Sequence, residues 1–408
     1  MLIIKNGRIF TMADRVLDPG NVYIENGRII DVNDDTNPTV NEDDVVIDAT
    51  DLWVLPGIVE AHSHIGITEE KKGMEGDDCN ETTSPVTPEL RALDAINPLD
   101  PAFHNAIQAG ITTVLVGPGS TNVVGGQFLL MKTHGRVIDD MKILEPAAMK
   151  VSFGENPKGA YKDLNKPPSS RMTIASLLRE QLFQAVQYQT KKQNAAKNNE
   201  TFEEDFCLEA WMPVLEKKIP LKAHVHRTDD ILTAIRIAKE FDLNLTLDHC
   251  SEAHIIADEI KESGFPCIVG PDVACRNKLE IKNADFKTVG ILAKKGILVA
   301  ITTDHPVTLI QYLPICAGLA AKKGLGIEEG LKAITINAAK ICGAGERIGS
   351  IEIGKDADIA IFTGNPMEVF THTVYTIING EVVYEWDDDE HEYKDCIEQF
   401  YKEHREYM

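Results

Sequence analysis

The chain has 408 residues, of which 43% are hydrophobic and 26% are charged, values that are typical of a soluble globular protein. Acidic residues number 64 against 41 basic ones, and the resulting net charge of -23 disfavours nucleic acid and anionic lipid surfaces as partners. No stretch approaches the roughly 18 apolar residues that a membrane span needs. The eight cysteines are scattered without a CxxC pair, as in a protein of the reducing cytoplasm.

Both ends of the chain are predicted to contribute strands to one small β-sandwich domain. Residues 1–53 contain the strand-like segments LIIKNGRIF and VYIENGRIIDV, and residues 347–386 contain VYTIINGEVVYEW. Each segment carries an Asn-Gly pair, which favours a tight turn between antiparallel strands. The three pairs begin at Asn6, Asn26 and Asn379. Residues 387–408 start with the acidic run DDDEHE and are predicted to form a peripheral tail or an oligomer contact.

The long middle of the chain, residues 54–346, alternates short apolar runs with helical segments. This alternation is typical of a parallel sheet with crossover helices, and eight such units predict a closed (β/α)8 TIM barrel. A doubly wound sheet is the alternative. A long excursion, residues 156–219, follows the fourth run and has a helical pattern from Met172 to about Asn199. The eight runs are 54–59, 111–116, 127–132, 147–151, 220–225, 243–247, 266–270 and 297–303.

Polar residues that can bind a metal ion follow four of these runs. Because side chains at the carboxyl ends of barrel strands face a common mouth, we expect these residues to meet there. Neutral imidazole suits zinc, manganese or iron, and a carboxylate adds a hard, negatively charged oxygen. The candidates are His62 and His64 after the first run, His224 and His226 after the fifth, Asp248, His249 and His254 after the sixth, and Asp304 and His305 after the eighth.

This pattern predicts one or two divalent metal ions, with zinc favoured over manganese or iron. A bound ion lowers the pKa of water from about 15.7 toward about 7 and so makes hydroxide available at neutral pH. A carboxylate beside that water can take its proton and pass it to a leaving amine. Asp304 is placed both to bind the ion and to act as this proton shuttle.

Five motifs resemble those of the amidohydrolase superfamily, in its imidazolonepropionase- and prolidase-like branch, and they span almost the whole chain. LPGIVEAHSHIG resembles the first-strand motif, LKAHVHRTDDI the fifth, LDHC the sixth and TTDHP the eighth. The stretch TINAAKICGAGERIGSIEIGKDADIAIF resembles the return from the barrel into the small β domain. The resemblance implies this split fold and metal-dependent hydrolysis. It also implies that His62, His64 and Asp304 form the deeper metal site and that His224 and His249 are the fifth- and sixth-strand ligands.

The bridging ligand is left open between two residues of AAMKVSFGENPK. Members of the superfamily use either a carboxylated lysine or a glutamate at this place, so Lys150 and Glu155 are the alternatives. If neither binds, the site is expected to hold one ion. His226 is expected to face the substrate, to support the ligands or to be structural.

The predicted function is hydrolysis of an amide, peptide-like or cyclic amide C–N bond in a small molecule. Deamination of a heterocycle at one metal ion is the alternative, and a non-catalytic scaffold role is a third. We also expect a homo-oligomer. Long loops without regular structure are often functional, and three lie near the predicted mouth, at 76–100, 116–127 and 154–161. The candidate substrate-binding residues are Arg91, Gln127, His226 and Arg227.

Overall fold

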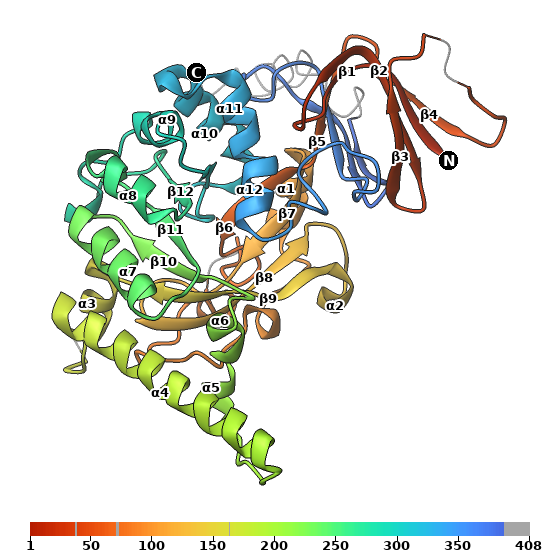
Figure 1. The fold of residues 1–408 in the computed structure, drawn as a ribbon. Helices are drawn as coiled ribbons and strands as arrows, with labels where there is room; N and C mark the ends of the chain where they lie inside the picture. Colours follow the sequence, from red (N-terminus) through yellow and green to blue (C-terminus); the bar gives the residue numbers. More distant parts are fainter. Residues whose placement is uncertain (37–38, 71–72, 163, 387–408) are drawn as a thin grey trace, which may run out of the picture.

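A computed structural model describes residues 1–36, 39–70, 73–162 and 164–386 (Figure 1). Two eight-stranded sheets organise the chain, one forming a nearly closed barrel and the other assembled from both chain ends. The predicted barrel with a small, split β domain is therefore confirmed, and the doubly wound alternative is not adopted. The tail predicted over 387–408 lies outside the described residues.

Every predicted apolar run of the middle region contributes to a barrel strand, because strands buried on both faces are apolar almost throughout. The run 54–59 is divided, since residues 53–56 join the other sheet and the barrel strand starts at Ile58. All six residues of β6 are buried, including its polar ones. The barrel strands are β6 (Ile58–Ser63), β7 (Ile111–Val116), β8 (Val124–Lys132), β9 (Lys142–Ser152), β10 (Leu221–Val225), β11 (Leu245–His249), β12 (Cys267–Val269) and β13 (Val299–Ile301).

The direction of β8 differs from the all-parallel expectation. This strand pairs antiparallel with both β7 and β9. The connection from β7, residues 117–123, is too short for the crossover that a parallel strand requires, so the chain reverses there. As a result the amino end of β8 lies at the barrel mouth, where Gly126 is opposite Lys150.

Helices surround the barrel, and their apolar faces explain their positions. In α7 the buried residues Ile231, Ala234, Ile235 and Ala238 follow the spacing of one helical face. The long helix α4 confirms the helical pattern predicted from Met172 and projects away from the β domain (Figure 1). The helices are α1 (Pro101–Gln108), α2 (Ile138–Met141), α3 (Glu155–Lys162), α4 (Arg171–Asn198), α5 (Phe206–Glu209), α6 (Met212–Leu215), α7 (Thr228–Glu240), α8 (Ala257–Ser263), α9 (Lys287–Lys294), α10 (Leu313–Ala320), α11 (Ile327–Ala333) and α12 (Ile336–Ile341). Within the described ranges, none of them combines the length and apolarity that crossing a bilayer would take.

The second sheet has the order β16-β15-β14-β5-β1-β2-β3, with β4 paired to β1. Two predicted Asn-Gly turns are confirmed: Asn26 and Asn379 have positive φ angles of 50° and 51° in two-residue hairpin turns. Its strands are β1 (Leu2–Phe10), β2 (Val16–Glu25), β3 (Arg28–Asn33), β4 (Val45–Asp48), β5 (Trp53–Pro56), β14 (Ile359–Phe362), β15 (Thr373–Ile378) and β16 (Glu381–Glu385).

The turn predicted at Asn6 is wrong. Strand β1 continues through Asn6 and Gly7 and forms a bulge, with a shift of register against β2 between Ile4 and Gly7. Asn6 has a φ of 62°, and a Cβ on Gly7 would lie 2.6 Å from Val54. The Asn6-Gly7 pair therefore bends β1 and lets it lie close to β5. It does not form a hairpin turn, because β1 remains paired along both edges.

A buried ion-pair cluster joins the two sheets at the barrel end opposite the mouth. Lys132, the last residue of β8, donates a hydrogen bond to Asp356 at 2.9 Å and another to Asp358. All three side chains are at most 4% exposed. The reversed direction of β8 places this lysine at the junction with the β domain.

Candidate metal centre

The first group of metal-ligating atoms comes from β6 and from the loop after β13. The Nε2 atoms of His62 and His64 lie 3.5 and 3.2 Å from Oδ1 of Asp304. His62 is fully buried, and the other two side chains are at most 14% exposed. His62 and His64 thus lie beside Asp304, which is 240 positions further along the chain than His64, and each of the three offers one nitrogen or oxygen atom that could hold a metal ion.

The second group comes from the carboxyl ends of β10 and β11 and consists of His224, His226 and His249. Their ligand atoms all lie within 4.8 Å of one another. The ring centroids of His224 and His249 are 4.4 Å apart, and the ring of His226 stacks on that of His249 at 5.0 Å. The two groups adjoin, because the His62 and His249 rings are 4.9 Å apart.

Hydrogen bonds at Nδ1 fix the orientation of three rings. His62 pairs with Oδ2 of Asp248 at 2.9 Å. His64 and His249 pair with the carbonyl oxygens of Gly117 at 2.7 Å and Gly270 at 2.9 Å. These acceptors hold a ring proton on Nδ1, so Nε2 carries the lone pair whenever the ring is neutral. This carboxylate- or carbonyl-supported tautomer is the arrangement of metal-binding histidines.

Buried ligand atoms without partners show that a cation fits here. Among the described residues, Nε2 of His224, Nε2 of His249 and Oδ1 of Asp304 are buried and make no hydrogen bond of acceptable geometry. A buried polar atom without a partner is costly. A divalent ion accepts these lone pairs, and imidazole with carboxylate is the donor set that zinc prefers.

The charge states of the rings suit this use. Burial lowers the pKa of His62, His224, His226 and His249, so these rings are neutral. At His64 burial also lowers the pKa, but Cys79 and Asp304 outweigh it and raise the value to about 10. Since a metal ligand must be deprotonated, cation binding at His64 displaces this proton.

The two alternative bridging residues are placed differently. Lys150 is fully buried in β9, and its Nζ lies 3.4 Å from Nε2 of His62. Burial lowers the pKa of Lys150 to about 8. Glu155 begins helix α3 with an exposed side chain, and it belongs to neither ligand group. The structure therefore brings Lys150, and not Glu155, to the centre.

Glu60 stabilises the first ligand group through hydrogen bonds. It was not among the residues predicted from the sequence. This fully buried carboxylate of β6 accepts hydrogen bonds from the N–H of His62 at 3.1 Å and from the N–H and hydroxyl of Thr303 at 2.8 and 2.6 Å. It thus ties the strand of His62 to the residue before Asp304. Asp304 itself has a φ of 51°, and His249 has a φ of 73°. Such conformations are uncommon outside glycine and cluster at functional sites.

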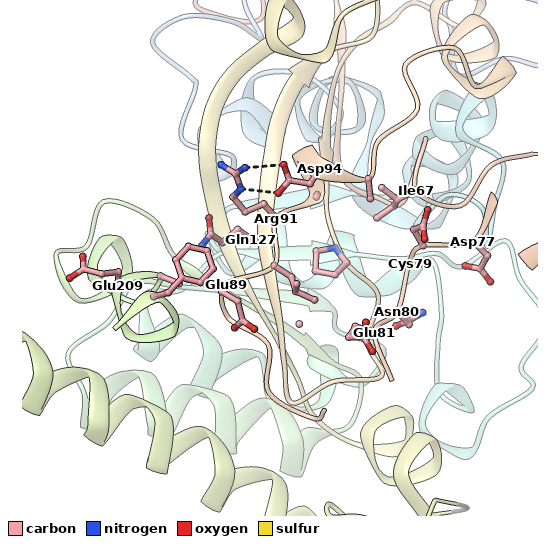
Figure 2. A pocket seen from close by; sticks show the side chains of 18 residues that line it. Ile67, Asp77, Cys79, Asn80, Glu81, Glu89, Arg91, Asp94, Gln127 and Glu209 are labelled. Atoms are coloured by element: carbon pink, nitrogen blue, oxygen red, sulfur yellow. Dashed lines mark hydrogen bonds and ion pairs between the residues drawn. The ribbon is translucent and has the colours of Figure 1, made fainter. Parts of the chain in front are cut away.

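A cavity of about 730 Å³, whose lining side chains are drawn in Figure 2, is connected to the centre through Cys79. Cys79 lines it, and the thiol of this residue interacts with His64. Gly125 also lines it, and a Cβ there would lie 3.2 Å from Cγ of Lys150. Most of the charged side chains in its wall are acidic, namely Asp77, Asp78, Glu81, Glu89, Asp94 and Glu209.

The predicted substrate-binding residues fall in three places. Arg91 and Gln127 line the cavity, but the Arg91 guanidinium is paired with Asp94 at 2.9 Å and with Glu145 at 3.4 Å (Figure 2). His226 belongs to the second ligand group. Arg227 is paired with Asp229 at 2.9 Å at the start of α7, outside the lining of this cavity.

Two further residues contact the ligand groups, and only the first of them, Asp248, was a candidate from the sequence. Asp248 was expected among the metal-binding residues after the sixth run, but it belongs to neither ligand group and instead orients His62 through a hydrogen bond to Nδ1. Glu280 lies in a short 3-10 helix, η4 (Leu279–Ile281), in the loop after β12, and its Oε1 is 3.9 Å from Nε2 of both His224 and His226. No local pattern marks Glu280, because only the folded loop brings it to the mouth.

Comparisons with known proteins agree with this geometry. Residues 262–384 match the profile described as "Amidohydrolase family". The chain is 27% identical over 389 residues to Amidohydrolase tasK of Hapsidospora irregularis, a match that covers 88% of this chain but only 39% of that protein. It is 25% identical over 429 residues to a 5-methylthioadenosine/S-adenosylhomocysteine deaminase of Thermoanaerobacter pseudethanolicus, covering 94% of each.

Among solved structures, an amidohydrolase from Thermotoga maritima MSB8 superposes with a TM-score of 0.91. The two sequences are 39% identical, and the match covers 95% of this chain and 100% of that one. Identity at this level over nearly the whole length extends beyond the fold to the family. The chain belongs to the amidohydrolase superfamily.

Proposed function

We propose that this metal-dependent hydrolase of C–N bonds cleaves an amide-type bond of a small molecule at a centre of two divalent cations. The observation that carries the proposal is the pair of adjoining ligand groups with unpartnered, buried nitrogen and oxygen atoms. Zinc is the proposed metal, because neutral imidazoles outnumber carboxylates in the two groups. When bound there, a divalent cation supplies a nucleophilic water at neutral pH.

Each side chain of the centre has a proposed role. His62, His64 and Asp304 hold one cation, and His224 and His249 hold the other. Lys150 is the proposed bridge, because its buried amine has a pKa of about 8 and is therefore partly neutral near neutral pH. A neutral amine adds to carbon dioxide to form a carbamate, with a new N–C bond and the loss of one proton. That carbamate offers oxygen ligands to both groups.

Asp304 is the proposed proton shuttle. One carboxylate oxygen lies 3.2 Å from His64, and the other lies 3.9 Å from Nδ1 of His249, so the group stands between the two ligand groups. From this place it can accept a proton as the C–N bond is attacked and return it to the leaving nitrogen. Removing such a group typically slows a reaction by about 10²–10⁴-fold.

The cavity suggests the charge of the substrate. Its acidic wall carries one arginine, Arg91, which is already paired with Asp94 and Glu145. We therefore propose an uncharged or cationic substrate in preference to one with several carboxylates. The predicted pairing of Arg91 with a substrate carboxylate would require these ion pairs to open.

The test is metal content by plasma mass spectrometry on untagged protein, followed by assays with N-acyl amino acids, dipeptides and cyclic amides. The expected result is about two equivalents of metal per chain and faster cleavage of amides of basic than of acidic amino acids. About one equivalent with release of ammonia from a heterocycle would replace this proposal with deamination. The deaminase relative, similar over almost its whole length, makes this the second candidate. Absence of bound metal after reconstitution would favour a non-catalytic scaffold role.

A cytoplasmic location and a homo-oligomeric state are also proposed. The location is supported by the cysteines, since the seven in the described part of the chain are all free. Size-exclusion chromatography with light scattering tests the oligomeric state.

A further inference from the structure

Glu280 is an unexplained carboxylate at the edge of the second ligand group. Its side chain is only 2% exposed, although a carboxylate is rarely buried without a partner. Oε2 accepts a hydrogen bond from the N–H of Glu155 at 2.8 Å. Oε1 is buried and has no hydrogen-bond partner among the described residues. Oε2 is thus held by a hydrogen bond, whereas Oε1 remains available to accept a hydrogen bond or to bind a cation.

The free oxygen faces nitrogen atoms that can share a ligand with it. Oε1 lies 3.9 Å from Nε2 of His224 and 3.9 Å from Nε2 of His226. Nδ1 of His226 pairs with the hydroxyl of Ser251 at 2.9 Å, which leaves its Nε2 directed at this point. Two atoms bonded to one zinc ion at about 2.1 Å can be at most about 4.2 Å apart. The observed spacing therefore allows a common cation.

The backbone at Gly154 leaves space for the Glu280 carboxylate. Gly154 has a φ of 84°, and a Cβ at this position would lie 2.6 Å from Oε2 of Glu280. Only glycine permits both the conformation and the approach. Among the described residues, Glu280 forms no ion pair with a lysine or arginine, and its charged or chargeable neighbours within 4 Å are His224 and His226. A buried negative charge of this kind needs a cation.

We propose that Glu280 is an anionic ligand of the second cation and that it binds the ion together with His226 and the two histidines already assigned to it, His224 and His249. This inference rests on the proposed two-cation centre and deepens it. A carboxylate from the loop after β12 then joins the ligands contributed by the barrel strands. Binding of the second cation also fixes η4 at the barrel mouth, because the ion connects this loop to β10.

The variant Glu280→Gln tests the proposal, since glutamine retains an oxygen for the Glu155 N–H but removes the charge. Apoprotein is titrated with Co²⁺, and binding is followed by the visible absorption of the ion and by plasma mass spectrometry after dialysis. The expected result is normal binding of the first equivalent and at least about tenfold weaker binding of the second, since loss of even an outer partner of a ligand costs about 10–100-fold.

Glu252→Gln is the matched control. Glu252 is also a buried carboxylate at the barrel mouth, 8% exposed, but both of its oxygens have protein donors, the N–H of Thr228 at 3.0 Å and the amide of Asn283 at 2.8 Å. This variant is expected to bind both equivalents like the wild type. Circular dichroism of the apoproteins compares their folding.

The outcomes separate this inference from the proposed function. Two equivalents bound with wild-type affinity by Glu280→Gln would overturn the role of Glu280 and leave the two-cation centre standing. A wild type that binds one equivalent, lost in Glu280→Gln, would support Glu280 as a ligand and overturn the two-cation function. One equivalent retained in both proteins would overturn both.

Discussion

The substitution Asp248→Asn should separate the stability of the barrel from its affinity for metal. Asp248 is fully buried, and Oδ2 contacts both Nδ1 of His62 at 2.9 Å and Nζ of Lys222 at 3.1 Å. Asparagine keeps the shape and an acceptor but removes the charge. The ammonium of Lys222 then retains the Ala61 carbonyl at 3.0 Å as its remaining hydrogen-bond partner, without a counter-charge.

The two effects have different expected sizes. Breaking a buried ion pair by removing one partner costs about 3–5 kcal/mol. For a barrel of roughly 290 residues, this lowers the thermal midpoint of the apoprotein by roughly 5–8 °C. The weaker partner for His62 should reduce zinc affinity by about 10–100-fold. Calorimetry of the apoprotein and competition with a zinc-binding dye measure the two quantities separately.

The double variant Lys222→Met with Asp248→Asn tests whether the loss of stability and the loss of zinc affinity have different causes. Removal of the unpaired ammonium should restore most of the thermal midpoint but none of the zinc affinity, because His62 still lacks its carboxylate partner. Asp100→Asn is the control, since this buried carboxylate accepts backbone N–H groups away from the ligand atoms. Wild-type zinc affinity in Asp248→Asn would refute the positioning role. A double variant as unstable as the single one would refute the ion-pair explanation.

Four further substitutions test the proposed centre. His64→Ala should abolish turnover and remove about one equivalent of metal, and full activity would contradict the assignment of the first ligand group. Asp304→Asn should retain the fold, checked by circular dichroism, while kcat falls by at least about 10²-fold; an unchanged kcat would exclude the proton shuttle. Lys150→Ala should lower the metal content measured by plasma mass spectrometry, whereas Glu155→Ala should not, because the Glu155 side chain is exposed. Equal metal content in both variants and the wild type would exclude Lys150 as an essential bridge.

The barrel could be predicted because buried strands leave a direct trace in the sequence. Strands buried on both faces are largely apolar, and each of the eight predicted runs contributes residues to a barrel strand. An apolar run does not show the direction of its strand, however, so the sequence pattern did not predict that β8 runs antiparallel. The length of the connection was the available signal: only residues 117–123 separate β7 from β8, too few for a helical crossover.

The meeting of the candidate ligands could be predicted for a related reason. His62, His64, His224 and His249 lie within one residue of the carboxyl ends of their strands, where the barrel itself determines that they meet. Glu280 lies 11 residues beyond the end of β12 in an irregular loop, so its position depends on Gly154 and the Glu155 N–H. The turn predicted at Asn6 was wrong because strand pairing on both edges of β1 outweighed the local preference of Asn-Gly for a turn.

The reversal of β8 connects the candidate site to the rest of the molecule. At the mouth, Gly126 has a φ of 120°, and a Cβ there would lie 2.4 Å from the carbonyl oxygen of Leu90. The loop that forms the cavity wall can therefore lie directly on the strand beside Lys150, and the N–H of Gln127 bonds the Leu90 carbonyl at 2.8 Å. At the other end of β8, Lys132 forms ion pairs with Asp356 and Asp358 at the junction with the β domain. A parallel strand in this place would turn Lys132 toward the candidate metal centre and remove the glycines from the mouth. The direction of one strand thus determines both the wall of the cavity and the junction of the two sheets.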